Sequence, residues 1–267
     1  MKNTAVIKLM LQGKLRFRES RTLLGLRSSI HPRKYFVSDE LKTVYIPISK
    51  SGNSSIKKML LRAEGIPESE LSHPTKPYFI HSNKNLKRFT QSRWRKKWDD
   101  YFTFTVVRNP VSRFISSHYN KFLDQEKIDQ RGFELHRHLS GLFTPDLSAI
   151  DLLNTLMTIS DKMTNEHFVP QKFWIYKHHK CQPSIYNLEN LTPLIEDLHA
   201  RGVHIKAIEH SNHSKGIHLT PVSKELLALI ARRYKDDFVT FDYEAAVDPA
   251  SQELDSGTSS PPPFKAP

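Results

Sequence analysis

Residues 44–60, VYIPISKSGNSSIKKML, run an apolar stretch directly into a turn of small residues and then into a helical pattern. The first residues are β-branched or aromatic, as a buried strand requires, and the turn SGNSS lets a ligand approach the main chain. We predict that the helix begins near Ser54, with its first amides directed at the turn. Such amides lack partners within the helix and favour negative charge. The segment therefore predicts a site for a phosphate or sulfate group.

The turn differs from the loop of nucleoside-triphosphate-binding proteins, G-x-x-x-x-G-K-[ST]. Its lysine, Lys50, precedes the single glycine, Gly52, whereas the triphosphate loop places its lysine after a second glycine. A kinase or GTPase interpretation is weakened for this reason. An ordinary strand-to-helix connection also explains the segment when it is taken alone, because such turns are often rich in serine and glycine.

Residues 101–122, YFTFTVVRNPVSRFISSHYNKF, repeat the same arrangement. A predicted strand ends at Arg108, and Pro110 occupies the first turn of a predicted helix, where proline is favoured. Arg113 and Ser116 are three residues apart on that helix, so they share a face just beyond Arg108. An arginine and a hydroxyl at a helix start would hold a second phosphate. The alternative is an arginine that pairs with a neighbouring acid.

Together the two segments resemble the sulfotransferases that use 3′-phosphoadenosine 5′-phosphosulfate (PAPS), and most closely the carbohydrate sulfotransferase group, family 2. The resemblance rests on K-x-G-x-[ST] at residues 50–54 and on R-N-P-x-x-R-x-x-S at residues 108–116. Two residues separate Pro47 from Lys50, where the family usually has none. Weaker similarities follow in family order at 165–171, 185–191 and 234–243, so the resemblance covers about residues 41–243.

The resemblance implies an α/β, P-loop-like three-layer fold with a central, mostly parallel sheet flanked by helices. At 267 residues the chain can bury a full core as one domain. We expect an N-terminal arm at 1–40, a sulfotransferase domain at 41–245 and a disordered tail rich in proline and serine at 246–267. The apolar spacing predicts helices at 82–100, 149–160 and 222–234, the second of them packed against the sheet.

The resemblance also implies a reaction, in which an acceptor hydroxyl attacks the sulfur of PAPS in line and adenosine 3′,5′-bisphosphate leaves. Lys50 would stabilise the negative charge that grows on the bridging oxygen. No metal is assigned, because sulfuryl transfer in the family needs none. The residues expected to bind PAPS are Lys50, Ser51, Gly52, Asn53, Ser54 and Ser55 around the 5′-phosphate, and Arg108 and Ser116 at the 3′-phosphate.

The attacking hydroxyl also needs a base, and two histidines are candidates because the unperturbed pKa of histidine lies near neutrality. His81 follows an apolar triplet and falls between the two segments, where family relatives carry a histidine. His167, within the sequence NEHF, is the second candidate. For each of them a hydrogen-bonded structural histidine is the alternative.

The balance of charge is basic, with 40 Lys and Arg against 28 Asp and Glu and a net charge of +12. Such a surface attracts anions with an affinity that weakens with salt. A basic run between His81 and Trp98 is interpreted either as a solvated helix face or as the border of the acceptor cleft. We expect a glycan acceptor, anionic or neutral, and no nucleic-acid partner. The alternatives are a noncatalytic module that binds polyanions, RNA or glycan, and a P-loop kinase.

A single cysteine, Cys181, excludes an internal disulfide and indicates a reducing compartment. The apolar stretch at 5–11 is short and is interrupted by Lys8, so it predicts neither a spanning helix nor a signal peptide. We therefore expect a cytoplasmic bacterial enzyme. Weak peripheral contact between its basic N-terminal arm and an anionic membrane is a further expectation. The sequence leaves the acceptor's identity and the oligomeric state open.

Overall fold

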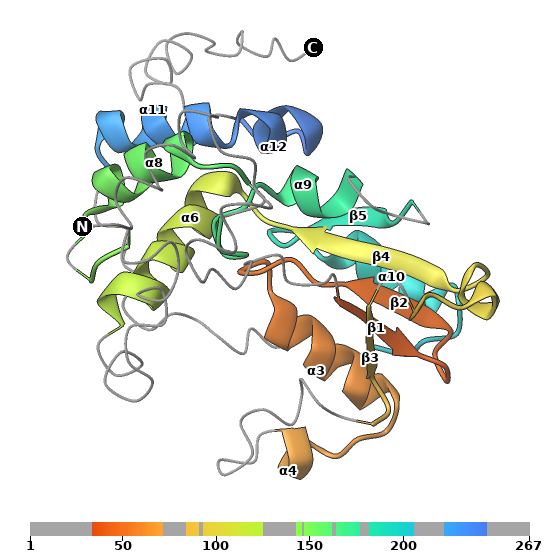
Figure 1. Ribbon diagram of the computed structural model, residues 1–267. Helices are drawn as coiled ribbons and strands as arrows, with labels where there is room; N and C mark the ends of the chain where they lie inside the picture. Colours follow the sequence, from red (N-terminus) through yellow and green to blue (C-terminus); the bar gives the residue numbers. More distant parts are fainter. Residues whose placement is uncertain are drawn as a thin grey trace, which may run out of the picture.

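The computed structural model describes residues 34–71, 84–90, 93–124, 143–145, 147–161, 164–176, 182–205 and 222–244. Its centre is a five-stranded sheet with the order β3-β1-β2-β4-β5 (Figure 1). The strands are β1 (Lys34–Ser38), β2 (Thr43–Ile46), β3 (Lys87–Thr90), β4 (Phe102–Val107) and β5 (Ser184–Asn187). β4 is parallel to both of its neighbours, whereas β1 is antiparallel to β2 and β3. The sheet is therefore mixed, and its parallel half carries both predicted anion-binding turns.

Helices cover both faces of this sheet. On one face, α3 (Asn53–Ala63) and α10 (Thr192–His199) share an apolar core with β1, β2, β4 and β5, and the short α4 (Glu68–Leu71) adds Leu71 to it. On the opposite face, α9 (Gln171–Tyr176) and the segment after α12 (Lys235–Thr240) share a smaller core with Val107 at the end of β4. The prediction of a three-layer α/β fold is thus confirmed.

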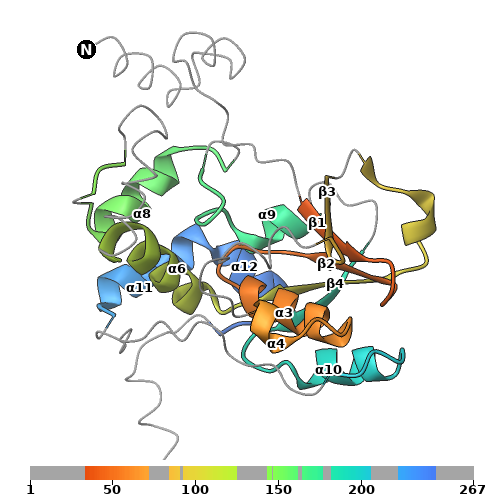
Figure 2. The same cartoon turned by 90° about the horizontal axis from the view of Figure 1, so that it is seen from below.

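A second group of helices lies beside the sheet, beyond the end of β4 (Figures 1 and 2). It consists of α6 (Pro110–His118), α8 (Ala149–Thr158) and α11 (Lys224–Arg233), and a π-helical turn, Tyr119–Leu123, extends α6. The helices predicted at 149–160 and 222–234 are confirmed as α8 and α11. The prediction that α8 packs against the sheet is wrong, because its buried leucines contact α11 and share with α6 and α11 an apolar core that contains no strand residue. Apolar spacing identifies a buried face but not its partner.

The prediction of a helix at 82–100 is also wrong. Its described part contains β3, paired with β1, and a single 3-10 turn, Lys96–Trp98. Trp98 is 1% exposed and packs with Phe89, Trp94 and Tyr35 on one face of the sheet. These aromatic contacts outweigh the helix propensity of the surrounding lysines and arginines, as tertiary packing commonly does. The run is therefore not a helix face.

The start of the sheet domain also differs from its prediction. β1 lies within residues 1–40, the range expected to form an N-terminal arm, and it pairs with both β2 and β3. Its central residues Phe36 and Val37 are at most 3% exposed. At least the part of that range from residue 34 onward therefore belongs to the sheet.

Candidate active site

The two predicted anion-binding turns lie side by side. β2 and β4 are parallel neighbours, so the turn that leads from β2 into α3 and the turn that leads from β4 into α6 meet at one edge of the sheet (Figure 1). We call residues 47–52 the first turn and residues 108–109 the second turn. Arg108 Nη1 donates to the carbonyl oxygen of Lys50 at 3.3 Å, and Arg113 Nε donates to that of Ser49 at 3.0 Å. The two turns are therefore in direct contact.

The first turn ends in a helix start without a side-chain cap. Gly52 precedes α3 with a φ of +72°, a left-handed conformation that glycine adopts readily. A Cβ at this position would lie 2.6 Å from Leu188 Cδ1, at the end of β5. Asn53 turns its side chain inward and accepts a hydrogen bond from the Tyr45 hydroxyl at 2.6 Å. The start of α3 thus has the uncapped form that binds anions.

The second turn starts α6 with two local signals, a capping side chain on Asn109 and the proline at position 110. Only the role of Pro110 was predicted from the sequence. The Asn109 side chain accepts hydrogen bonds from the amides of Val111 and Ser112, and Pro110 occupies the first helical position. Glu189 contacts the same turn, since its Oε1 accepts from the Asn109 amide at 2.9 Å. Its Oε2 accepts from the Tyr243 hydroxyl at 2.8 Å, which connects the end of the described chain to the site.

The two arginines have different surroundings. Arg113 is 1% exposed, and burial lowers its pKa, with the charges of Tyr234 and Asp237 opposing that shift. Arg108 is half-buried; burial lowers its pKa as well, and Glu189 is foremost among the groups that oppose it. Arg113 therefore supports the first turn from inside, whereas Arg108 lies where it can meet a ligand. Ser116 follows on α6 and is 8% exposed.

Gln171, the first residue of α9, links the two turns, a role that was not predicted from the sequence. Its Oε1 accepts from the Ser51 hydroxyl at 3.0 Å and from the Arg108 amide at 2.9 Å. Its Nε2 donates to the Arg108 carbonyl oxygen at 2.8 Å. Ser51 and Gln171 are both fully buried. The hydroxyl of Ser51, a residue predicted to bind PAPS, is thus directed at Gln171 and supports the turn.

Asp237 on α12 holds the start of α9. Its two carboxylate oxygens accept hydrogen bonds from the amides of Gln171 and Lys172, each at 2.8 Å. Burial raises the pKa of Asp237, and the charge of Arg113 together with these donors opposes the rise. α12 therefore fixes α9, and the first residue of α9 fixes both turns. Only its place in the segment NEHFVPQ, which matches the family pattern, could have indicated Gln171 from the sequence.

His167 is held in a defined orientation. Its Nδ1 lies 2.7 Å from Asn165 Oδ1, which also accepts from the His167 amide at 3.1 Å. Because an amide oxygen only accepts hydrogen bonds, Nδ1 is the donor in this bond, and in the neutral ring Nε2 is then the nitrogen that can act as a base. The Ser117 hydroxyl donates to the His167 carbonyl oxygen at 3.0 Å and joins this segment to α6. His81, the other candidate base, lies outside the described residues.

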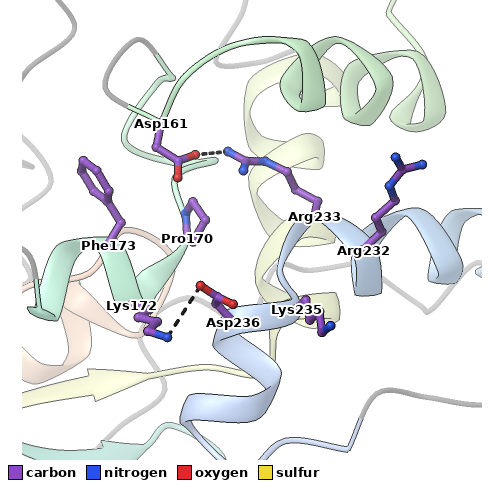
Figure 3. Close-up of a pocket in the computed structure, with 8 residues that line it drawn as sticks. All are labelled: Asp161, Pro170, Lys172, Phe173, Arg232, Arg233, Lys235 and Asp236. Atoms are coloured by element: carbon purple, nitrogen blue, oxygen red, sulfur yellow. Dashed lines mark hydrogen bonds and ion pairs between the residues drawn. The ribbon is translucent and has the colours of Figure 1, made fainter.

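A hollow of about 550 Å³, lined mainly by charged residues, lies beside α9 and includes no residue of the two turns (Figure 3). Two adjacent residues of α9 face different parts of the molecule. The Gln171 side chain contacts the two turns, and the Lys172 side chain lines the hollow. Two ion pairs cross it, Arg233 with Asp161 and Lys172 with Asp236, the latter at 3.6 Å. The residues lining the hollow are Asp161, Pro170, Lys172, Phe173, Arg232, Arg233, Lys235 and Asp236.

The described part of the chain contains neither a cluster of metal-ligand side chains nor a helix that could span a membrane. In those residues no group of three or more His, Cys, Asp or Glu side chains is arranged to hold a metal ion. The helices described there are also too short or too polar to cross a membrane.

Comparison with known proteins identifies the family. The sequence profile described as "Sulfotransferase family" matches residues 33–244, which is most of the chain. The chain belongs to this sulfotransferase family. The match begins one residue before β1 and ends at the last described residue, so it covers the sheet, both turns and α9 to α12. The resemblance to the family 2 carbohydrate sulfotransferases is thereby confirmed.

The relatives found among curated proteins are carbohydrate sulfotransferases of vertebrates. Carbohydrate sulfotransferase 10 of Gallus gallus is 30% identical over 99 residues, which are 36% of this chain and 28% of that protein. Carbohydrate sulfotransferase 14 of Homo sapiens is 26% identical over 162 residues, 57% of this chain and 40% of that protein. The mouse form is 25% identical over 238 residues, 79% of this sulfotransferase and 60% of its relative. No solved structure matches the chain.

The matched stretch therefore spans less than two thirds of each of these relatives. Because the relatives are animal proteins, they lend no support to the expected bacterial origin. The expected cytoplasmic location stays a prediction.

Proposed function

We propose that this sulfotransferase transfers a sulfuryl group from PAPS to a hydroxyl of a glycan and releases adenosine 3′,5′-bisphosphate. The observation that carries the proposal is the contact between Arg108 of the second turn and the Lys50 carbonyl of the first turn. A donor with anionic groups at the 3′ and 5′ positions of one adenosine needs two anion sites close together, and this contact brings the two turns next to each other. The names of the relatives, carbohydrate sulfotransferases 10 and 14, support a glycan as the acceptor.

The first turn would hold the 5′-phosphate. The amides at the start of α3 have no side-chain cap, and Ser54 and Ser55 are the second and third residues of that helix. The helix dipole adds to the attraction for an anion there. Asn53 contributes its amide alone, because its side chain is bound to Tyr45.

The second turn would hold the 3′-phosphate through Arg108, with Ser116 as the hydroxyl that the resemblance assigns to the same group. A guanidinium matches a phosphate geometrically and keeps its charge at any physiological pH, even where burial lowers its pKa. The main chain of Arg108 is fixed at both its amide and its carbonyl by Gln171. Arg108 is therefore oriented before a ligand arrives.

Transfer itself needs a cation near the bridging oxygen and a base near the acceptor hydroxyl. PAPS supplies a sulfuryl group attached to a stable leaving group. Lys50 belongs to the first turn, and its ammonium group is the cation that would stabilise the charge that develops on the bridging oxygen. His167 offers an Nε2 lone pair with its opposite nitrogen anchored to Asn165, and His81 is the second candidate base.

Transfer of labelled sulfate from PAPS to a panel of polysaccharides and glycolipids would test the proposal. We expect Lys50→Ala to lower the rate by about 100-fold or more, as loss of one charge-stabilising group commonly does. Arg108→Ala should weaken binding of adenosine 3′,5′-bisphosphate by about 10- to 100-fold, the cost of one charged hydrogen-bond donor. Lys235→Ala and Arg232→Ala are matched controls, since both remove exposed cations at the hollow beside α9 (Figure 3).

Nucleotide selectivity separates this function from its alternatives. A sulfotransferase should bind adenosine 3′,5′-bisphosphate in preference to ADP without magnesium, which a thermal-shift titration measures. A P-loop kinase would show the reverse preference, and a noncatalytic polyanion-binding module would show little preference. Transfer that survives both Lys50→Ala and Arg108→Ala would show that the site lies elsewhere.

A further inference from the structure

We propose that Gln171 couples the two ends of the donor site and thereby sets its preference for a nucleotide phosphorylated at both the 3′ and the 5′ positions. This inference rests on the proposed function, because it takes the first turn as the 5′ site and the second turn as the 3′ site. Gln171 is a positioning and specificity-determining residue in this account. It acts through Ser51 and Arg108, and not by contact with the reacting atoms.

The carboxamide of Gln171 makes one contact with the first turn and two with the second. Its Oε1 accepts from both the Ser51 hydroxyl and the Arg108 amide, so a single oxygen atom joins the turns. Its Nε2 holds the Arg108 carbonyl oxygen at 2.8 Å. Ser51 lies between Lys50 and Gly52, which places the contact next to the proposed lysine and directly before the start of α3. A shift of either turn must therefore move this oxygen or break a bond to it.

The main chain that carries the carboxamide is held in place by Asp237. Asp237 accepts from the amides of Gln171 and Lys172 at 2.8 Å each, and both Gln171 and Asp237 are fully buried. In such surroundings water does not replace a lost partner, so the three bonds of the carboxamide persist together or leave buried groups unsatisfied. The link between the turns is therefore rigid.

Glutamine is chemically suited to this position in a way that its nearest analogues are not. Glutamate would retain the accepting oxygen but would lose the donor to the Arg108 carbonyl. It would also place a negative charge between two sites that bind anions. Asparagine is one methylene shorter, and methionine has the length but no amide donor. Only a neutral group of this length with one donor and one acceptor satisfies all three bonds.

A rigid link between two binding sites gives coupled binding. When one end of a ligand orders its turn, Gln171 also orders the other turn, so the second contact costs less entropy than it would alone. A ligand with both phosphates gains from this coupling, whereas a ligand with one phosphate does not. Removal of the link should therefore reduce the advantage of the doubly phosphorylated nucleotide more than it reduces binding of a single phosphate.

Titration calorimetry with three nucleotides tests the inference: adenosine 3′,5′-bisphosphate, adenosine 5′-monophosphate and adenosine 3′-monophosphate. The measured quantity is the ratio of the bisphosphate affinity to the 5′-monophosphate affinity. We expect Gln171→Met to reduce this ratio by about tenfold, within the range typical of coupling between sites. The neighbouring substitution Lys172→Gln should leave the ratio unchanged, because that side chain faces the hollow (Figure 3).

An unchanged ratio in Gln171→Met, whether or not all affinities fall together, would overturn the inference. If that variant does not fold, Ser51→Ala decides in its place, because it removes only the bond to the first turn: a reduced ratio supports the coupling and an unchanged ratio contradicts it. Failure of the proposed function is recognised separately. In that case the unsubstituted protein itself shows no preference for the bisphosphate over ADP.

Discussion

Gly52 is the residue at which the first turn becomes α3, and two separate constraints act on it. Its φ of +72° disfavours any side chain, and a Cβ would press against Leu188 of the neighbouring β5 region at 2.6 Å. The turn therefore passes close to the end of β5 because glycine occupies this position. The helix start that would receive an anion depends on that path.

A left-handed conformation costs an alanine about 1–2 kcal/mol. We expect Gly52→Ala to lower the free energy of unfolding by more than this amount. Since Leu188 must also move, the amides at the start of α3 should shift, and binding of adenosine 3′,5′-bisphosphate should weaken by about tenfold or more. Urea unfolding and calorimetry measure the two effects.

Gly65 provides the matched control for this substitution. It has a φ of +80°, and a Cβ there meets nothing within 4 Å. Gly65→Ala should therefore carry the backbone cost alone and retain nucleotide binding. Equal loss of binding in the two variants would contradict the role given to the contact with Leu188.

At the scale of elements, the parts of the site that the sequence predicts are those with local signals. β2, α3, β4 and α6 follow from apolar runs, from the Ser- and Gly-rich turn and from Asn109-Pro110, because their caps and turns involve residues close in sequence. β3 could not be found in this way, since its pairing with β1 depends on residues about fifty positions away. The partners of α8 escaped prediction for the same reason.

The supporting contacts of the site are the clearest case of this limit. Gln171 reaches Ser51 across 120 positions of sequence and Asp237 across 66. No local pattern distinguishes a glutamine that bonds two turns from one on a surface. Such residues can be read from a sequence only through a family pattern, and their role needs the fold.

The link between α12 and α9 can be tested at a single carboxylate. We expect Asp237→Asn to lower the free energy of unfolding by about 1–3 kcal/mol, because one of the two buried amides of α9 loses its acceptor. The start of α9 should then loosen, and the affinity for the donor should fall with it. Chemical unfolding and donor KM measure these effects.

Asp236→Asn is the control, since it alters the adjacent residue of the same helix. The Asp236 side chain is 72% exposed and pairs with Lys172 at 3.6 Å in the hollow beside α9 (Figure 3). Its loss should change stability by at most about 0.5 kcal/mol. The proposed link would be wrong if the two variants behaved alike.

At the scale of the whole molecule, the basic character of the chain is partly neutralised by specific pairs. Asp39 contacts Lys87, Lys97 and the Tyr101 hydroxyl, and the hydrogen bond from Lys97 is the largest cause that lowers the pKa of Asp39. Lys87 and Lys97, which belong to the basic run between His81 and Trp98, thus hold β3 and the following 3-10 turn to the β1–β2 connection. Net charge alone therefore overstates the surface available to a polyanion.

Lys57 gives the molecule an unusual dependence of stability on pH. This residue of α3 is 4% exposed, and its ammonium group lies 3.8 Å from the centre of the Phe36 ring. Burial, followed by the charges of Lys34 and Arg88, lowers its pKa from 10.5 to about 7, and Glu166 opposes the shift. Between these pH values the unfolded chain binds a proton that the folded protein does not. The free energy of unfolding should therefore rise with pH across this interval.

Lys57 should raise the free energy of unfolding by up to about 1.4 kcal/mol per pH unit as the pH increases from about 7 to about 10. This gain is lost as the pH falls back toward 7. Lys57→Met keeps the length of the side chain and removes the titration. Urea unfolding of both proteins at pH 7, 8 and 9 isolates the effect, because other titrating groups are common to the two. We expect the difference in stability to move in favour of the unsubstituted protein as the pH rises. Parallel stability curves would mean that Lys57 keeps an ordinary pKa in the folded protein, and the burial of its charge on α3 would then cost little.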